Sequence, residues 1–339
     1  MSPAAPPGAG PSNDPERIAA FARSRFGADA RLERLAGDAS DRTFFRLRAP
    51  SLSPLVLMVH AAPFDLESLP FFLHARFLHE IGAAVPQIVA SYPSAGILVV
   101  QDLGDESLQI HLEKCDAQRR RFLYFQAVQL IAFLQQEGTR ALTPDLPAFR
   151  VALDRERLLF EMNFFVEHYV QGLLGSPLTR AAAQRLDAWL RALAEEVAGI
   201  RRVLCHRDFH SRNLMVKGER LYMVDFQDAR MGPFTYDLAS LARDSYVELP
   251  EDLVQEMVEF YRESSRAPED AEEFHAAFAI TSLQRNIKAI GTFASQAMLR
   301  GNRGYLQYIA PTLASVTRNL RRRGDEEILA LLTGPLAWR

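Results

Sequence analysis

Two short polar motifs, each following an apolar run, hold the residues best suited to chemistry in this chain. Asp208 follows the run at 203–205, Asn213 stands five residues later, and Asp225 closes the run at 221–224. This H-R-D-x-x-x-x-N and D-F spacing is typical of phosphoryl transfer from Mg²⁺-bound ATP. One carboxylate must take up the acceptor proton, while another carboxylate and an amide oxygen hold Mg²⁺. The sequence therefore predicts Asp208 as the catalytic base and Asn213 and Asp225 as Mg²⁺ ligands, with His206 bracing the loop.

The same residues are open to two other interpretations. A surface hairpin also concentrates Asp and Asn in its turns. His206, Asp208 and His210 alternate along an extended segment and would share one face, as ligands of a metal hydrolase do. The segment lacks further nearby His or Cys residues that would complete such a metal site.

Length and composition limit the class of protein. The 339 residues suffice for two lobes, 48% of them are hydrophobic, and the net charge of −3 argues against a nucleic-acid partner. There is no apolar run of about 18 residues, so no membrane span is predicted. Residues 1–13 lack the features of a signal peptide and are predicted to be a disordered tail. Cys115 and Cys205 fit no metal spacing, which suits a reducing cytoplasm.

Hydrophobic periodicity divides the remaining chain into two lobes. A helix is expected from Pro15, after an N-cap at Asn13 or Asp14. Strands are expected near 43–47, 54–59, 87–91 and 96–100, and a further helix over 71–81, which makes 14–100 a small sheet-rich lobe. After a hinge at 101–104, residues 105–339 are predicted to form a helical lobe with helices at 117–136, 155–169 and 180–197. The predicted fold class is α+β, two-lobed and protein-kinase-like, with ATP between the lobes.

Two turn-like segments are candidates for nucleotide binding. The turn at 37–42 precedes a predicted strand, so the Ser40 hydroxyl and nearby backbone N–H groups would cover the phosphates, with Arg42 adding charge. Gln101, Asp102 and Leu103 lie in the hinge, where backbone groups would bind the adenine edge. Both segments are also ordinary turns when taken alone.

Four polar residues beyond the motifs are candidates for the acceptor side, and a fifth for structure. Asp237 is expected to cap a helix and brace the catalytic loop. Arg243 and Asp244 would line the acceptor site. Arg285 and Lys288 stand three apart in a predicted helix at 282–299, so they project together and suit an anion such as a substrate carboxylate or phosphate. The alternative for Arg243 and Asp244 is an exposed ion pair, and the alternative for Arg285 and Lys288 is a solvated basic edge.

Together these motifs resemble the aminoglycoside phosphotransferase family over roughly residues 30–330. Within it, the sequence is most similar to the bacterial anomeric kinases of N-acetylmuramate and N-acetylglucosamine. The resemblance implies a cytoplasmic enzyme that uses ATP and Mg²⁺ to phosphorylate the C1 hydroxyl of a free amino sugar in peptidoglycan recycling. It implies no nucleic-acid or membrane partner, and it leaves the oligomeric state open. The segments that carry it are 37–40, 101–105, 206–214, 225–229, 232–233, 236–238 and 284–288.

One position departs from the wider kinase pattern. Met58 stands where a kinase has its phosphate-binding Lys, and Phe71 lies near the place of the partner Glu. The Lys and the Glu are expected to be lost together, because either charge alone would be half-buried and unpaired. Phosphate neutralisation would then fall to Mg²⁺, backbone N–H groups and Arg42. The alternatives are a nucleotide-binding pseudokinase and a kinase of another hydroxyl compound, such as an aminoglycoside or a choline-like alcohol. The intact motif residues favour an enzyme, and the acceptor-side cations weigh against a cationic aminoglycoside.

Overall fold

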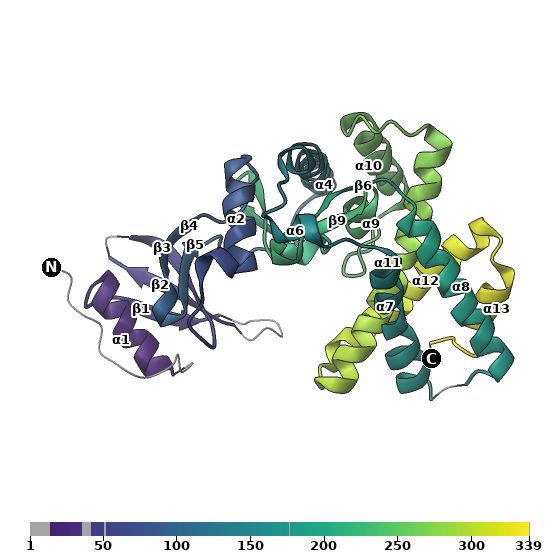
Figure 1. The fold of residues 1–339 in the computed structure, drawn as a ribbon, viewed down its shortest axis with the longest axis horizontal. Helices are drawn as coiled ribbons and strands as arrows, with labels where there is room; N and C mark the ends of the chain where they lie inside the picture. Colours follow the sequence, from purple (N-terminus) through teal and green to yellow (C-terminus); the bar gives the residue numbers. More distant parts are fainter. Residues whose placement is uncertain (1–13, 36–41, 51, 176, 339) are drawn as a thin grey trace. The chain divides into compact units, whose positions relative to one another are not determined.

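The computed structural model describes residues 14–35, 42–50, 52–175 and 177–338. The chain divides into two compact units, drawn with their elements in Figure 1. Unit 1 consists of Met1–Asp105 and Lys217–Gln227, and unit 2 of Glu106–Val216 and Asp228–Arg339. The segment Lys217–Gln227 contains Asp225 and belongs with the sheet-rich unit, whereas the sequence division placed it in the helical lobe.

Unit 1 is built on a five-stranded antiparallel sheet with the order β1-β2-β3-β5-β4. The four predicted strands and both predicted helices of this unit are confirmed, and β1 is an additional edge strand. The elements are α1 Pro15–Phe26, β1 Arg31–Arg34, β2 Thr43–Ala49, β3 Leu52–Val59, α2 Pro70–Glu80, β4 Ile88–Tyr92, β5 Ile97–Gln101 and, from the second segment, β8 Arg220–Met223.

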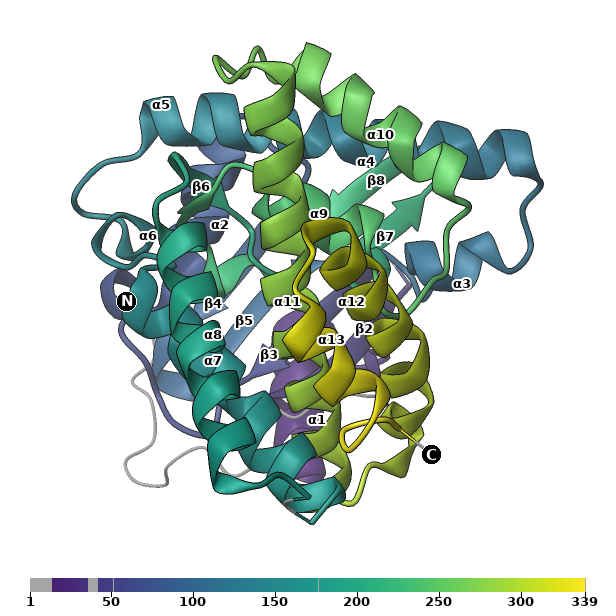
Figure 2. The same ribbon diagram turned by 90° about the vertical axis from the view of Figure 1, so that its right-hand side faces the viewer.

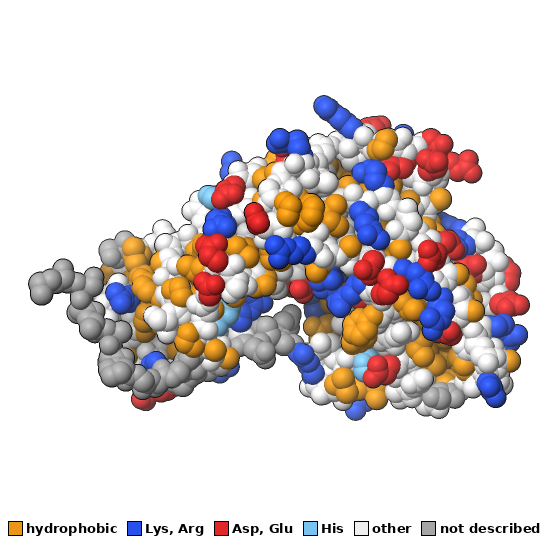
Figure 3. Space-filling view, viewed as in Figure 1, with side chains coloured by type: hydrophobic (Ala, Val, Ile, Leu, Met, Phe, Trp, Pro, Cys, Tyr) orange, Lys and Arg blue, Asp and Glu red, His pale blue; other side chains and the backbone are white. Residues whose placement is uncertain are grey.

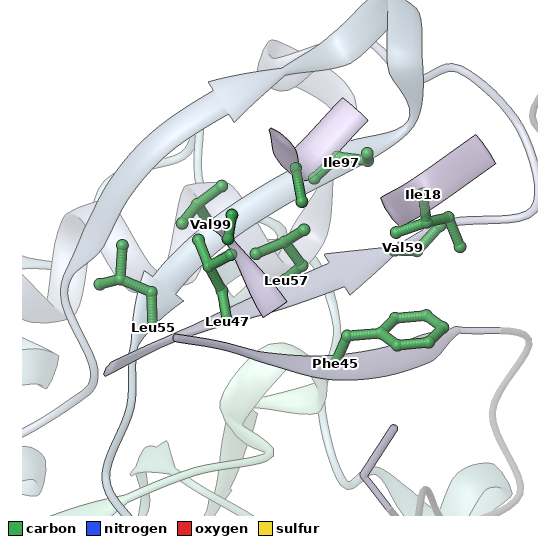
Figure 4. Close-up of a cluster of buried hydrophobic side chains, with 10 residues drawn as sticks. Ile18, Phe45, Leu47, Leu55, Leu57, Val59, Ile97 and Val99 are labelled. Carbon is green, nitrogen blue, oxygen red and sulfur yellow. The ribbon is translucent and has the colours of Figure 1, made fainter. Parts of the chain in front are cut away.

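Helix α1 covers one face of this sheet. It begins where expected, because the Asp14 side chain accepts a hydrogen bond from the Glu16 backbone N–H at 3.0 Å. Its buried residue Ile18 packs with alternate residues of the strands, including Leu57 and Val59 of β3 (Figure 4). Because successive strand residues point to opposite faces, Met58 lies on the face away from this cluster.

Unit 2 is mostly helical. Two short strands, β6 and β9, pair antiparallel within it, and β6 leads directly into the segment with the predicted catalytic residue Asp208. Its elements are α3 Leu108–Leu112, α4 Ala117–Phe133, α5 Thr139–Ala141, α6 Pro147–Arg150, α7 Arg155–Phe164, α8 Arg180–Ala198, β6 Arg202–Cys205, β7 Leu214–Lys217, β9 Arg230–Pro233, α9 Tyr236–Ala242, α10 Glu251–Ser264, α11 Ala271–Leu299, α12 Ile309–Arg323 and α13 Glu326–Thr333. Two π-helical segments, Leu134–Gly138 and Phe165–Leu173, continue α4 and α7.

Helix α11 lies among α7, α8, α9 and α12 of this unit (Figure 2). The apolar face expected from its spacing is buried, since Leu283 and Ile290 are fully enclosed. Gly291 permits a close approach to the segment that follows α7, because a Cβ there would lie 2.4 Å from the Phe165 backbone nitrogen. The backbones of α11 and of the α7 region are therefore in near contact, one turn beyond Lys288.

Oppositely charged side chains are mixed on one face of the protein surface (Figure 3). On the face drawn in Figure 3, Lys and Arg side chains lie interspersed with Asp and Glu. Across the described ranges, no helix combines the length and apolar character needed to span a membrane. Cys115 and Cys205 are free thiols, and Cys205 is buried at the end of β6.

Candidate active site

The predicted catalytic segment begins directly after β6 in a strained backbone conformation. Arg207 has a φ of 80°, in the left-handed region that costs free energy for a residue other than glycine. Buried Asp237, in the first turn of α9, accepts hydrogen bonds from the backbone N–H groups of His206 at 2.7 Å and Arg207 at 2.9 Å. These two charge-assisted bonds hold the turn that presents Asp208. Thr235, and not Asp237, occupies the N-cap position of the helix.

A second carboxylate braces the same segment further along. Asp244 is buried and accepts from the Ser211 backbone N–H at 2.9 Å and from the Tyr246 backbone N–H at 2.8 Å. Its neighbour Arg243 forms a two-pronged ion pair with Glu251 at 2.7 and 2.8 Å. Each of these two predicted substrate residues is therefore engaged with other groups of the protein.

Arg243 and Asp244 also line a cavity of about 640 Å³ with Tyr246, Asn286 and Tyr308. Arg285 and Lys288 do not belong to its lining. The structure thus separates the four predicted substrate residues into two pairs. One pair lines this cavity. In the other pair, Lys288 contacts Asp208, and the charge of Arg285 acts on the same carboxylate.

Asp208 lies in a positively charged environment. Lys288 Nζ contacts Asp208 Oδ1 at 3.1 Å, and the side chains of Asp208 and Lys288 are 31% and 14% exposed. Burial favours the protonated acid, but Lys288, Arg207 and other nearby cations hold the pKa of the Asp208 carboxyl well below its usual range. Asp208 is therefore ionised across the neutral range and acts as a hydrogen-bond acceptor.

The neighbouring His210 is neutral at pH 7. Burial, opposed by Asp244, lowers its pKa to about 4. Its ring packs edge-on against Tyr246, with centroids 5.0 Å apart. His206 packs similarly on Phe209, at 5.6 Å. Across the described ranges, no group of three or more His, Cys, Asp or Glu side chains is arranged to hold a metal ion, so the H-x-D-x-H ligand set does not converge.

The two predicted Mg²⁺ ligands occupy different units. Asn213 Nδ2 donates to the Asp208 backbone carbonyl at 2.9 Å, which leaves the amide Oδ1 as the atom suited to a cation. Asp225 follows β8, is exposed, has a φ of 66°, and accepts from Gln227 Nε2 at 2.6 Å. Both donors are hard oxygens of the kind that Mg²⁺ prefers. Their joint action on one ion stays a prediction.

Arg285 is the most unusual cation of the site. The residue is 5% exposed, and its Nε and Nη1 have no hydrogen-bond partner within the described residues. Its charge acts on Asp208, His210 and Tyr236. Buried donors without partners cost free energy, and an anion placed against them would recover it.

Several predicted nucleotide residues are engaged inside unit 1. Asp102 pairs with buried Arg46, whose Nε lies 2.6 Å from Asp102 Oδ2. Lys217 Nζ donates to the Asp102 backbone carbonyl at 2.7 Å. The Gln101 backbone N–H donates to the Gln87 carbonyl at 2.8 Å, and Leu103 is buried. The Asp102 side chain therefore has a structural partner, and the adenine contact stays a prediction for the hinge backbone.

The phosphate-covering side is only partly described. Ser40 lies outside the described residues. Arg42 Nη1 contacts Met58 Sδ at 3.7 Å, and Phe71 stacks on Phe226 with ring centroids 5.1 Å apart. Burial and Arg42 lower the pKa of His60 to about 4, so a neutral ring follows β3. Met58, which is predicted to stand at the place of the usual kinase Lys, is thus a buried thioether beside a guanidinium.

Comparison with known proteins assigns the chain to a family. The phosphotransferase enzyme family matches residues 31–276. This chain belongs to that family. It is 32% identical over 297 residues to the N-acetylmuramate/N-acetylglucosamine kinase of Neisseria meningitidis serogroup B, covering 86% of each chain. The predicted family is confirmed, and the chain is a phosphotransferase with a hydroxyl acceptor.

Solved structures confirm the predicted kinase-like fold. A choline kinase from Cryptosporidium parvum Iowa II gives a TM-score of 0.63 at 13% identity, over 96% of this chain and 100% of that one. An amicoumacin kinase in complex with AMP-PNP and Ca²⁺ gives 0.61 at 16% identity, over 92% and 94%. At these identities the likeness concerns the fold, and the family itself implies ATP as the phosphoryl donor.

Met58 provides a test of how this phosphotransferase manages without the usual Lys. We expect Met58→Lys to leave ATP affinity unimproved and to lower the free energy of unfolding, because its ammonium would be buried beside the Arg42 guanidinium. Met58→Leu, which keeps the volume, is the matched control. Nucleotide titration and thermal melting measure both effects. A clear gain in ATP affinity for the Lys variant would show that Met58 is a simple defect.

The sequence interpretation missed one buried acid close to the phosphotransferase site. Glu161 of α7 is 4% exposed and pairs with Arg207 and Arg157. Its signal was present in the sequence, since Glu161 shares the helical spacing of Leu158 and Phe165 on an apolar face. A charged residue at such a position indicates a buried ion pair.

Proposed function

We propose that this phosphotransferase phosphorylates the anomeric C1 hydroxyl of N-acetylmuramate and N-acetylglucosamine with ATP in peptidoglycan recycling. The observation that carries the proposal is the pair of cations, Arg285 and Lys288, beside the Asp208 carboxylate. N-acetylmuramate bears a lactyl carboxylate, which suits the buried Arg285 donors. The similarity to the Neisseria kinase along most of both chains supports the same substrate class.

In this proposal each motif residue has one task. Asp208, ionised and held by the braced turn, orients the sugar hydroxyl and accepts its proton as transfer proceeds. Asn213 and Asp225 would hold Mg²⁺, which supplies charge neutralisation at the phosphates when bound. Lys288 donates to Asp208, so it also lies where negative charge gathers during transfer. Ser40, Arg42 and the hinge backbone at Gln101–Leu103 are proposed to bind the nucleotide.

The setting of the enzyme follows from the same proposal. The proposed compartment is the cytoplasm, where a free amino sugar released from the cell wall and ATP are both present. The two free thiols of this chain are stable in such a reducing compartment. Its partners are then these two small molecules, without nucleic acid or a membrane. The proposal is independent of oligomeric state.

A phosphorylation screen tests the proposal. The purified chain is incubated with ATP, Mg²⁺ and, in turn, N-acetylmuramate, N-acetylglucosamine, an aminoglycoside and choline. We expect a sugar 1-phosphate, identified by ³¹P–¹H coupling to the anomeric proton and by loss of the reducing end. Phosphate on another hydroxyl, or turnover of only the aminoglycoside or choline, would contradict it. ATP binding without turnover of any acceptor would select the pseudokinase alternative.

Arg285 is expected to discriminate between the two sugars. A lost charge-assisted hydrogen bond is worth about 1.5 to 3 kcal/mol. Arg285→Gln should therefore lower kcat/KM for N-acetylmuramate by roughly ten- to a hundredfold more than for N-acetylglucosamine. Lys288→Gln should impair both sugars, because Lys288 contacts Asp208. Arg243→Gln is the control. It should not discriminate between the two sugars, because Arg243 is paired with Glu251. Equal losses for the two sugars in Arg285→Gln would remove it as the carboxylate receptor.

A further inference from the structure

Glu161 is a buried carboxylate that the motif chemistry leaves without a role. Its Oε1 accepts from Arg207 Nη2 at 2.9 Å and from Arg157 Nε at 3.1 Å. It lies on the face of α7 that also buries Leu158 and Met162 completely. A carboxylate on such a face is stable only with close cationic partners. Burial favours its neutral form, yet Lys288, Arg207 and Arg157 together lower its pKa, so it stays charged at pH 7.

Glu161 anchors the residue that sets the direction of Asp208. Arg207 adopts the strained left-handed conformation directly before Asp208, and its backbone N–H is held by Asp237. The other end of Arg207 is held by Glu161 and by Asp228, whose Oδ2 lies 3.3 Å from Nη1. The Asp228 side chain is 60% exposed and Glu161 is buried, so Glu161 is the stronger of the two anchors. Arg207 is therefore fixed at its backbone and at its guanidinium.

Glu161 and Asp208 also share the same cations. Against the effect of burial, Lys288 and Arg207 lower the pKa of both carboxyl groups. Gly291, three residues after Lys288 on α11, is where this helix closely approaches the α7 region. Lys288 contacts Asp208 at hydrogen-bond distance and acts on Glu161 through its charge alone.

We propose that Glu161 is a positioning residue, which fixes the orientation of the Asp208 carboxylate through Arg207. The proposal rests on the phosphoryl transfer proposed above, with Asp208 facing the acceptor, and it is independent of which hydroxyl compound is used.

The first test separates kcat from KM. Glu161→Gln should lower kcat by at least about thirtyfold and change the KM values for ATP and acceptor by less than about threefold. Glu156→Gln removes the same charge from the same helix at a side chain that is 77% exposed, and it should leave kcat unchanged. If Glu161→Gln folds poorly, Glu161→Asp keeps the charge and shortens the reach to Arg207, and a kcat fall of about fivefold or more is expected. Normal kcat in a folded Glu161 variant would overturn the proposal.

The second test asks whether Glu161 acts through Asp208. In an Asp208→Asn background, adding Glu161→Gln should lower kcat by less than about twofold, because coupled residues are not additive. If Glu161→Gln lowers kcat as much in the Asp208→Asn background as it does in the wild-type chain, the proposal is overturned.

Hydrogen exchange provides a readout without turnover. In Glu161→Gln the His206 and Arg207 amides should exchange faster, while protection in α8 and α11 is kept. Unchanged exchange at both amides would overturn the positioning role. If the wild-type chain phosphorylates no sugar, the sugar assignment fails, and this exchange measurement still decides the role of Glu161.

Discussion

Replacing Asp208 by Asn should lower kcat by at least about a hundredfold, the usual range for removal of a general base. The affinity for ATP and Mg²⁺ should change by less than about threefold. The Asn side chain keeps the shape and one acceptor oxygen but loses the charge and the place for the proton. The ionised state of Asp208 is set by Lys288 and Arg207 against the effect of burial, so its charge is present throughout the neutral range.

Both quantities are measured on one preparation, with thermal melting to show that the fold is kept. Asp187→Asn is the matched control, because Asp187 is exposed and pairs only with its helical neighbour Arg191 among the described residues. Near-normal kcat together with lost nucleotide binding would identify Asp208 as a metal ligand and contradict its role as the base.

Asp225→Ala is expected to abolish turnover and to leave the protein folded. The residue is exposed, and its recorded hydrogen bond comes from Gln227 two positions later, so its removal disturbs no core contact. Without this carboxylate the phosphates would lose a ligand to the metal that neutralises them. The experiment measures kcat over a range of Mg²⁺ concentrations and the melting temperature.

Gln227→Ala is the control for Asp225, since it removes the hydrogen bond and keeps the carboxylate. It should retain most of the activity. Full activity of Asp225→Ala at ordinary Mg²⁺ concentrations would exclude Asp225 from the metal site.

The sequence by itself determined most of the elements of unit 1 and the residues of the motifs. Local signals suffice for these features: an N-cap before Pro15, an apolar run along β3, and helical spacing along α11 all act within one element. Hydrophobic periodicity predicts less reliably which side of a helix is buried. In α4, Phe122 is apolar and yet 49% exposed, whereas its neighbours Leu123 and Tyr124 are fully buried.

Only the tertiary structure decided which charges meet. Lys288 contacts Asp208 across 80 residues, Arg207 pairs with Glu161 across 46, and Arg243 is paired with Glu251 instead of facing Asp208. Where α11 approaches the α7 region, the close packing is possible because Gly291 has no Cβ. An ion pair inside a protein depends on distance and burial, and both are properties of the packed chain. Spacing along the sequence therefore identifies the reactive groups, and the fold determines the charges that surround them.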